Sequence, residues 1–227
     1  MKRILRSAIG KVTNMVNSAR VKGHTKYFCI GRNKTGTTSL KKAFEDLGYV
    51  VGNQKAAELL YDKYFFEDDF EPILRYCATA AVFQDVPFSY FKILPYLDER
   101  FPDSKYILTI RDNTDQWYQS LSKFHSKLFG KNGQIPSYED LQDATYVRKG
   151  FMTRAIEAHG TSKADPYNKA IMCAHYEKHN SDVLDYFKDR QEDLLVLNLS
   201  QENSYESFVN FVGVNSPYSA FPWENKT

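Results

Sequence analysis

Residues 26–48 read KYFCIGRNKTGTTSLKKAFEDLG, and no other stretch says as much about the fold. The apolar run at residues 26–31 is typical of a short buried strand. Residues 37–47 carry apolar side chains at helical spacing, and Gly48 provides a stop for that helix. The order of strand, glycine-containing loop and helix places the loop where a strand ends and a helix begins.

The rest of the chain alternates strand candidates with helical stretches. This alternation predicts an α/β fold, a three-layer α/β/α arrangement with a central parallel sheet of about five strands. A largely helical insertion at residues 115–187 precedes the last strand and offers room for a pocket or lid. Residues 26–227 contain no internal repeat or linker, so we expect a single domain there. The further strand candidates lie at residues 49–51, 80–83, 106–110 and 194–199.

Composition limits the class of protein. The chain has 227 residues, of which 42% are hydrophobic, enough to bury one sizeable core without metal or disulfides. Its three cysteines, Cys29, Cys77 and Cys173, are scattered and odd in number, which is typical of free thiols in a reducing compartment. No apolar run in the sequence approaches the roughly 20 residues of a membrane-spanning helix. We therefore expect a soluble, cytoplasmic protein.

Charge is distributed unevenly, although the net charge is only +2. Residues 1–44 contain eleven Lys or Arg and no acidic residue. A basic segment on an acidic body favours a polyanionic small molecule over a nucleic acid as ligand. Residues 1–25 also predict a basic amphipathic helix, which we expect to pack on the body. The alternative is peripheral contact of this helix with a membrane or partner, or a role as an organelle presequence.

The loop at residues 31–39 is suited to an anion, because backbone N–H groups and the positive end of a helix dipole meet there. Phosphate is the expected ligand. The loop of a nucleotide triphosphatase has Lys after its second Gly, followed by a Ser or Thr that holds magnesium. Here Thr37 follows Gly36 and Lys34 lies two residues earlier, which argues against that class. The alternative is structural: Gly36 permits a tight turn and the threonines cap a helix.

The stretch KTGTT at residues 34–38 resembles the loop with which sulfotransferases bind the phosphosulfate of 3′-phosphoadenosine 5′-phosphosulfate (PAPS). PDSKYILTIRD at residues 102–112 and WYQS at residues 117–120 are similar to the strand and helix that bind the 3′-phosphate of this donor. DVP at residues 85–87 and YEKHN at residues 176–180 extend the likeness to a bacterial-type subgroup. The resemblance covers the chain from about residue 26 to its end.

This resemblance implies a P-loop-like fold and an enzyme that transfers a sulfuryl group from PAPS to a hydroxyl or amine. The acceptor is then a small molecule, a carbohydrate or a lipid, and the donor's product is adenosine 3′,5′-bisphosphate (PAP). No metal and no nucleic acid are expected. The alternatives are a P-loop nucleotide kinase or hydrolase, and a non-catalytic nucleotide-binding protein of the same fold.

The resemblance also implies which residues bind the donor. The family's serine follows its arginine by eight residues, whereas Ser120 follows Arg111 by nine, so an extra residue must be accommodated near residues 113–115. Animal enzymes place a Trp after the two loop threonines to stack on adenine. This chain has Ser39 there, so the stacking residue must come from elsewhere, and Phe221 and Trp223 are the candidates. The implied donor-binding residues are Arg32, Asn33, Lys34, Thr35, Gly36, Thr37, Thr38, Ser39, Arg111 and Ser120.

Sulfuryl transfer needs charge stabilisation on the leaving phosphate and a base for the acceptor's proton. Lys34 is suited to the first role. Asp85 follows the strand candidate at residues 80–83, at the end where α/β sheets bind ligands, and is the candidate base. Animal sulfotransferases have a catalytic His before x-Pro in what looks like the same place as Asp85, followed here by Val86 and Pro87. The alternative role of Asp85 is that of a helix N-cap.

The histidines are weaker candidates. His175 and His179 stand four residues apart on a predicted helix, which would suit a pair of metal ligands. No third ligand and no metalloprotease pattern accompanies them in the sequence. We therefore expect no metal site, and we expect His179 to be structural or to face the acceptor.

Overall fold

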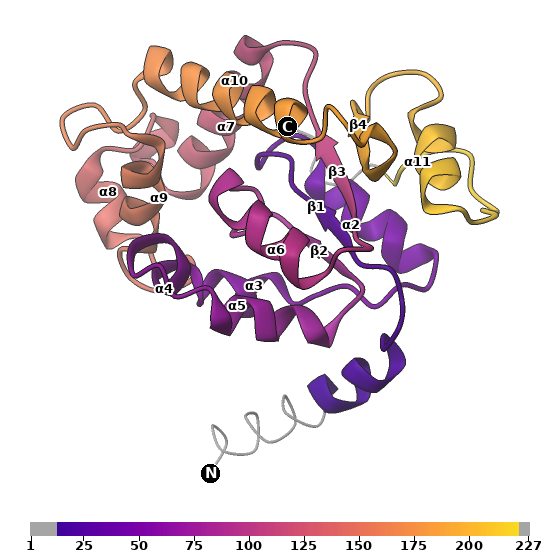
Figure 1. Cartoon of the computed structure of the whole chain (residues 1–227). Coiled ribbons are helices and arrows are strands. Elements are labelled where there is room, and N and C mark those ends of the chain that lie inside the picture. Colours follow the sequence, from indigo (N-terminus) through magenta and orange to yellow (C-terminus); the bar gives the residue numbers. More distant parts are fainter. Residues whose placement is uncertain (1–12, 223–227) are drawn as a thin grey trace.

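The computed structural model describes residues 13–222, so the predicted helix at residues 1–25 lies partly outside this range. Residues 13–20 are helical and project from the body in Figure 1. Their side chains Met15 and Val16 are exposed, and Val21, just beyond the helix, is buried. Within residues 13–222, no helix combines the length and the apolar character needed to cross a membrane.

Parallel strands form the central sheet of the described chain, in the order β2-β1-β3-β4. This arrangement confirms the predicted α/β fold, and each of the four strands overlaps a predicted one. The order places β1, and the loop that follows it, between β2 and β3. The strands are β1 (Tyr27–Cys29), β2 (Val82–Gln84), β3 (Lys105–Thr109) and β4 (Leu194–Leu197).

The strand predicted at residues 49–51 is reduced to a single bridge between Val51 and Val82. The described sheet therefore has four strands rather than about five. Gly52 packs directly on an aromatic side chain of β2, where a Cβ would come within 2.8 Å of the ring. Asn53 then caps the next helix with its side chain. The chain thus turns away from the sheet after one paired residue.

Helices cover both faces of the sheet (Figure 1). Because successive strand residues point to opposite faces, Tyr27 and Cys29 enter one core, whereas Phe28 and Ile30 enter the other. α2 and α11 close the first core, and the remaining helices contribute to the second. The helices are α2 (Thr37–Asp46), α3 (Gln54–Glu58), α4 (Tyr61–Phe66), α5 (Glu71–Tyr76), α6 (Leu94–Arg100), α7 (Thr114–Leu128), α8 (Tyr138–Asp143), α9 (Phe151–His159), α10 (Lys169–Tyr186) and α11 (Ser204–Val212).

The segment between β3 and β4 is largely helical, as predicted. It consists of α7 to α10, with a short 3-10 turn, η3 (Lys131–Gly133), between α7 and α8. α10 packs against both α7 and α9, and α8 packs against α9. This insertion forms a helical wall at one side of the sheet (Figure 1).

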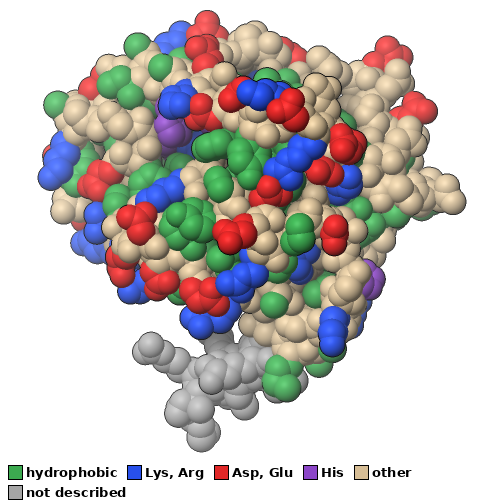
Figure 2. Space-filling view, viewed as in Figure 1, with side chains coloured by type: hydrophobic (Ala, Val, Ile, Leu, Met, Phe, Trp, Pro, Cys, Tyr) green, Lys and Arg blue, Asp and Glu red, His purple; other side chains and the backbone are tan. Residues whose placement is uncertain are grey.

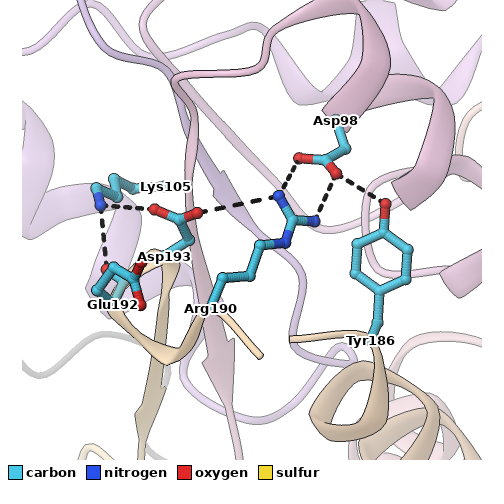
Figure 3. A network of polar contacts seen from close by, with 6 residues as sticks. All are labelled: Asp98, Lys105, Tyr186, Arg190, Glu192 and Asp193. Atoms are coloured by element: carbon cyan, nitrogen blue, oxygen red, sulfur yellow. Dashed lines mark hydrogen bonds and ion pairs between the residues drawn. The ribbon is translucent and has the colours of Figure 1, made fainter. Parts of the chain in front are cut away.

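A network of polar contacts fixes the segment in which the chain passes from the helical insertion back to the sheet (Figure 3). Arg190 donates from both terminal nitrogens to Asp98 of α6, over 2.9 and 2.5 Å, and Tyr186 of α10 donates to the same carboxylate over 2.8 Å. Lys105 at the start of β3 pairs with Asp193 over 2.7 Å. Charged, bidentate contacts of this kind are the strong class of hydrogen bond. They join the end of α10 to α6 next to the start of β4.

Basic and acidic side chains are intermingled on the face of the molecule that Figure 2 shows. Several pair within one helix, such as Lys41 with Glu45 and Lys178 with Asp182. Exposed pairs at this spacing contribute only about 0.3–0.5 kcal/mol each. The fold therefore depends mainly on the two apolar cores.

Candidate active site

The predicted anion-binding loop, residues 31–39, joins β1 to α2 at the carboxyl end of β1. Gly31 lies against β3, since a Cβ there would come within 2.1 Å of the Thr109 hydroxyl oxygen. Gly36 has a φ of 101°, and Lys34 also has a positive φ, of 67°. Two left-handed residues, one of them glycine, let the loop turn sharply while it rests on the sheet.

The N-terminus of α2 faces the same space as the loop. Gly36 is the N-cap residue, and the first turn of α2 contains no acidic side chain. Thr37, Thr38 and Ser39 line the adjoining cavity. The helix dipole and the N–H groups of a first turn favour an anion at such a position.

Thr35 holds the loop from the inside. Its side chain is buried, with the hydroxyl oxygen 2.5 Å from the Arg32 carbonyl oxygen and 2.6 Å from the Thr109 hydroxyl oxygen. Since a hydroxyl has one proton, Thr35 donates to the carbonyl and accepts from Thr109. The side chain of Thr35 thus lies beneath the loop and not among the residues that line the cavity.

Two side chains from beyond β3 bind the backbone of the loop. Arg111 donates from Nε to the Lys34 carbonyl over 2.7 Å. Trp117 of α7 donates from Nε1 to the Asn33 carbonyl over 3.0 Å. The segment that was expected to bind a second phosphate therefore touches the loop directly.

Ser120 lies on the face of α7 that also carries Trp117 and Phe124, because residues three and four apart share a helix face. Its hydroxyl oxygen is buried and has no hydrogen-bond partner in the described chain. Asn113 lies between Arg111 and Ser120 in the sequence and caps α7 with its side chain. Arg111 lines the cavity beside the loop, and Ser120 does not.

A cavity of about 240 Å³ opens beside the loop. It brings together Lys34, Asp85 and Arg111, which follow β1, β2 and β3. Because the carboxyl ends of parallel strands meet at one edge of a sheet, these three side chains converge. Apolar and aromatic residues on the insertion side form much of the opposite wall: Phe124, Leu128, Phe129, Tyr146, Phe151 and Met152.

Lys34 is partly buried in this cavity. Its ammonium nitrogen lies 3.9 Å from the centroid of the Phe124 ring, a cation–π distance. Burial and the neighbouring Arg111 guanidinium lower the pKa of Lys34, and Asp85 opposes this effect. A partly desolvated cation interacts more strongly with an anion than an exposed one does.

Asp85 directly follows β2, and its backbone is left-handed with a φ of 62°. Its carboxylate accepts hydrogen bonds from the Val86 N–H over 2.9 Å and from the Thr37 hydroxyl over 3.4 Å. Burial raises the pKa of Asp85 above its ordinary value. In the described chain the next helical element after Asp85 is η2 (Phe91–Ile93), whose N-cap is Tyr90. The alternative reading of Asp85 as a helix N-cap is therefore wrong.

Arg32 occupies another wall of the cavity and is almost fully buried. One terminal nitrogen donates to the Ser89 carbonyl over 2.7 Å, and the other lies 2.6 Å from Nε2 of His159. The guanidinium also stacks 4.2 Å from the centroid of the Tyr90 ring. Because a guanidinium only donates, Nε2 of His159 accepts and its proton lies on Nδ1. Arg32 is thus fixed between the segment that follows β2 and α9.

The histidines of the insertion are uncharged at neutral pH; three of them are buried and His175 is partly buried. Burial lowers the pKa of His125, His175 and His179 to about 3 and that of His159 well below its usual range. His179 donates from Nε2 to the Ile30 carbonyl over 2.8 Å, which is a structural contact. Residues 13–222 contain no cluster of three or more His, Cys, Asp or Glu side chains suited to a metal.

Sequence reasoning missed Glu58, the last residue of α3. Glu58 is only 5% exposed and lines the cavity together with Asp85. Burial raises the pKa of Glu58 to about 7. The sequence did contain one signal for Glu58, which is an acidic residue within the apolar run AAELLY at residues 56–61. An apolar run suggests burial, and a buried, unpaired Glu is unusual, so this position could have been singled out.

Of the two aromatic candidates for adenine stacking, the structure describes only Phe221. Phe221 packs against Tyr205 and Phe208, with ring centroids 5.0 and 5.3 Å apart, and so belongs to the core beside α11. Trp223 lies outside the described residues. Stacking by either side chain stays a prediction.

The site thus combines an anion-binding loop, a partly desolvated lysine, an arginine and a buried carboxylate around one cavity. Residues 26–227 match the family model described as a sulfotransferase domain. This match spans the loop, the Arg111 segment and the whole helical insertion. The search among curated proteins returns no match for this chain.

Proposed function

The chain belongs to the sulfotransferase family and is thus a sulfuryl transferase, and we propose that its donor is PAPS and its acceptor a small molecule with a hydroxyl or amine. One observation carries this proposal: Lys34 and Asp85 line the same cavity at the N-terminus of α2. A cation for the leaving group and a base for the nucleophile are the two groups that in-line transfer requires.

The proposed donor site consists of the loop and the segment after β3. Backbone N–H groups of the loop and the hydroxyls of Thr37 and Thr38 bind the 5′-phosphosulfate, while Thr35 shapes the loop. Arg111 offers a planar fork to the 3′-phosphate, and the buried, unpartnered hydroxyl of Ser120 supports a second contact there. Arg32, Asn33 and Ser39 complete the wall around the phosphosulfate.

In the proposed reaction, Asp85 accepts the proton that the acceptor hydroxyl loses as its oxygen bonds to sulfur. Lys34 donates a hydrogen bond to the bridging oxygen, on which charge develops as the bond between sulfur and that oxygen breaks. PAP leaves with the electron pair of this bond. Stabilisation of charge that appears only in the transition state raises the rate without tightening the ground state.

The test of the donor is ligand-dependent thermal stability, followed by turnover. PAP should raise the melting temperature, whereas ATP with magnesium and GTP should not, because a ligand stabilises the native state it binds. PAPS with a phenol should then yield the sulfate ester and PAP in equal amounts. Stabilisation by ATP with magnesium, and none by PAP, would contradict the proposal and favour a nucleotide kinase or hydrolase.

We also propose a reducing compartment, such as the cytoplasm, for this protein. Its cysteines Cys29, Cys77 and Cys173 are free, and the first two are buried. Free thiols of this kind are typical of cytosolic proteins. The exposure of Met15 and Val16 supports contact of the basic helix with a membrane surface or a partner rather than packing on the body.

A further inference from the structure

Glu58 forms a feature that sulfuryl transfer itself does not use. It lies on α3, outside the donor loop, and faces the cavity from the side of Gln54 and Tyr146. Lys34 and Asp85 suffice for the proposed chemistry. A second buried carboxylate in the same cavity therefore needs another explanation.

A chain of side-chain amides holds Glu58 in place. Gln84 of β2 donates from Nε2 to Oε1 of Gln54 over 2.8 Å, and Gln54 donates from Nε2 to Oε1 of Glu58 over 2.9 Å. Because Gln54 uses its oxygen toward Gln84, its NH₂ group must face Glu58. Glu58 thus receives a fixed donor on Oε1, which favours its ionised form. The hydroxyl of Tyr146 adds a longer contact of 3.5 Å to the same oxygen.

Both of these contacts reach Oε1 of Glu58, and neither partner is a cation. A buried carboxylate without a cation is costly, and the cost falls when a cation binds beside it. The charged or titratable groups that act on Glu58 are Asp85, Tyr146 and Lys55, and the lysine has the weakest effect. The protein itself therefore supplies little positive charge to this carboxylate.

Tyr146, whose hydroxyl contacts Glu58, belongs to a group of aromatic residues in the cavity wall. Tyr146, Phe129 and Phe151 line the cavity, and the Tyr146 and Phe151 ring centroids are 6.4 Å apart. Faces of aromatic rings attract organic cations, most strongly when the cation is desolvated. A carboxylate next to aromatic side chains is suited to bind a ligand that has an alkylammonium group and an apolar remainder.

We propose that the acceptor is a small aromatic or aliphatic alcohol that carries a cationic amine, with the ammonium bound by Glu58 and the hydroxyl placed at Asp85. This inference rests on the proposed function and deepens it. Both carboxylates line a cavity of about 240 Å³, so the amine and the hydroxyl belong to one small molecule. Glu58 is then a specificity residue, and Asp85 remains the base.

The test compares tyramine with 4-ethylphenol, which has the same phenol without the ammonium group. The wild-type enzyme should have a higher kcat/KM for tyramine, and Glu58→Gln should lower the ratio of the two kcat/KM values by about tenfold or more, the usual effect of removing one partner of a desolvated charge pair. Glu67→Gln removes an exposed carboxylate that pairs with Lys63 and is the matched control, which should keep the wild-type ratio.

The pH dependence of the preference for tyramine provides a second test. Because the pKa of Glu58 is raised to about 7, its carboxylate gains charge between pH 6 and pH 8, whereas tyramine stays cationic. The preference for tyramine should therefore increase over this interval in the wild type and stay flat in Glu58→Gln. Equal use of both phenols by the wild type, or an unchanged ratio in Glu58→Gln, would overturn the inference.

A binding measurement separates this inference from the proposed function. In the presence of PAP, tyramine should raise the melting temperature of the wild type more than 4-ethylphenol does at pH 8. Stabilisation by PAP with no difference between the phenols would overturn the role of Glu58 and leave sulfuryl transfer intact. Failure of PAP to bind would instead contradict the donor site.

Discussion

The hydroxyl of Thr37 donates a hydrogen bond to Oδ2 of Asp85 over 3.4 Å, which links the first residue of α2 to the residue after β2. The second oxygen of the carboxylate accepts from the Val86 N–H. Both contacts hold the carboxylate at the border between the donor loop and the cavity. The proposed base is thus oriented by the same helix N-terminus that is proposed to bind the phosphosulfate.

Substitution Asp85→Asn should lower kcat by about 10²–10⁴-fold, because the amide cannot accept the acceptor's proton. Burial raises the pKa of Asp85, and the base acts when deprotonated, so the wild-type rate should increase with pH through this raised pKa. The variant should lose that dependence while PAP still stabilises it. Asp185→Asn, at an exposed position that pairs with Lys188, is the control. Full turnover of Asp85→Asn across the pH range would assign the base elsewhere.

Lys34→Ala should lower kcat by about 10²–10³-fold, the effect of removing one donor to a developing anion. KM for PAPS should change less, since the loop backbone remains. Steady-state kinetics with PAPS varied at saturating acceptor measure both constants. Lys41→Ala removes a partly exposed lysine of α2 that pairs with Glu45, and it should leave both constants unchanged. An increase in KM alone would show that Lys34 contributes to ground-state binding only.

Much of the fold follows from local patterns in the sequence. The apolar run at residues 26–31 correctly predicts a short buried strand, and Gly48 correctly marks the end of α2. The predicted strand at residues 49–51 fails for a tertiary reason. Its pairing with β2 ends where Gly52 packs on an aromatic side chain, and no pattern within the segment indicates that contact.

Some features of the candidate site could also be predicted from the sequence, and others could not. Lys34, Asp85 and Arg111 each follow a strand, so a sequence that reveals its strands predicts that these side chains meet. The inward direction of the Thr35 hydroxyl depends on Thr109, 74 residues further along the chain. Burial of Glu58 likewise depends on distant segments, including that of Tyr146, 88 residues away. Such contacts become visible only when the segments are placed in space.

Arg111→Ala should mainly weaken donor binding, with KM for PAPS rising by roughly tenfold or more and kcat changing less. The guanidinium also donates to the Lys34 carbonyl, so Arg111→Lys, which keeps charge without the planar fork, should rescue binding only in part. Titration of each variant with PAP by calorimetry measures the affinity directly. Arg75→Ala, at an exposed position on α5, should bind PAP as the wild type does. Equal affinities in Arg111→Ala and the wild type would remove Arg111 from the donor site.

Gly31→Ala should destabilise the fold because β1 and β3 approach each other too closely at this point for any side chain. A Cβ would lie 2.5 and 2.6 Å from backbone atoms of Thr109, and backbone of a central strand cannot move aside as a side chain end can. We expect a loss of at least about 3 kcal/mol in the free energy of unfolding, or roughly 10 °C in melting temperature for a chain of this size.

Gly48→Ala is the control, since Gly48 has a positive φ of 82° but no atom within 4 Å of an added Cβ. Its cost should be only the left-handed strain of about 1–2 kcal/mol. Since Gly31 itself has no positive φ, a loss no larger than that of Gly48→Ala would show that the contact with Thr109 relaxes and does not require glycine at the start of the loop.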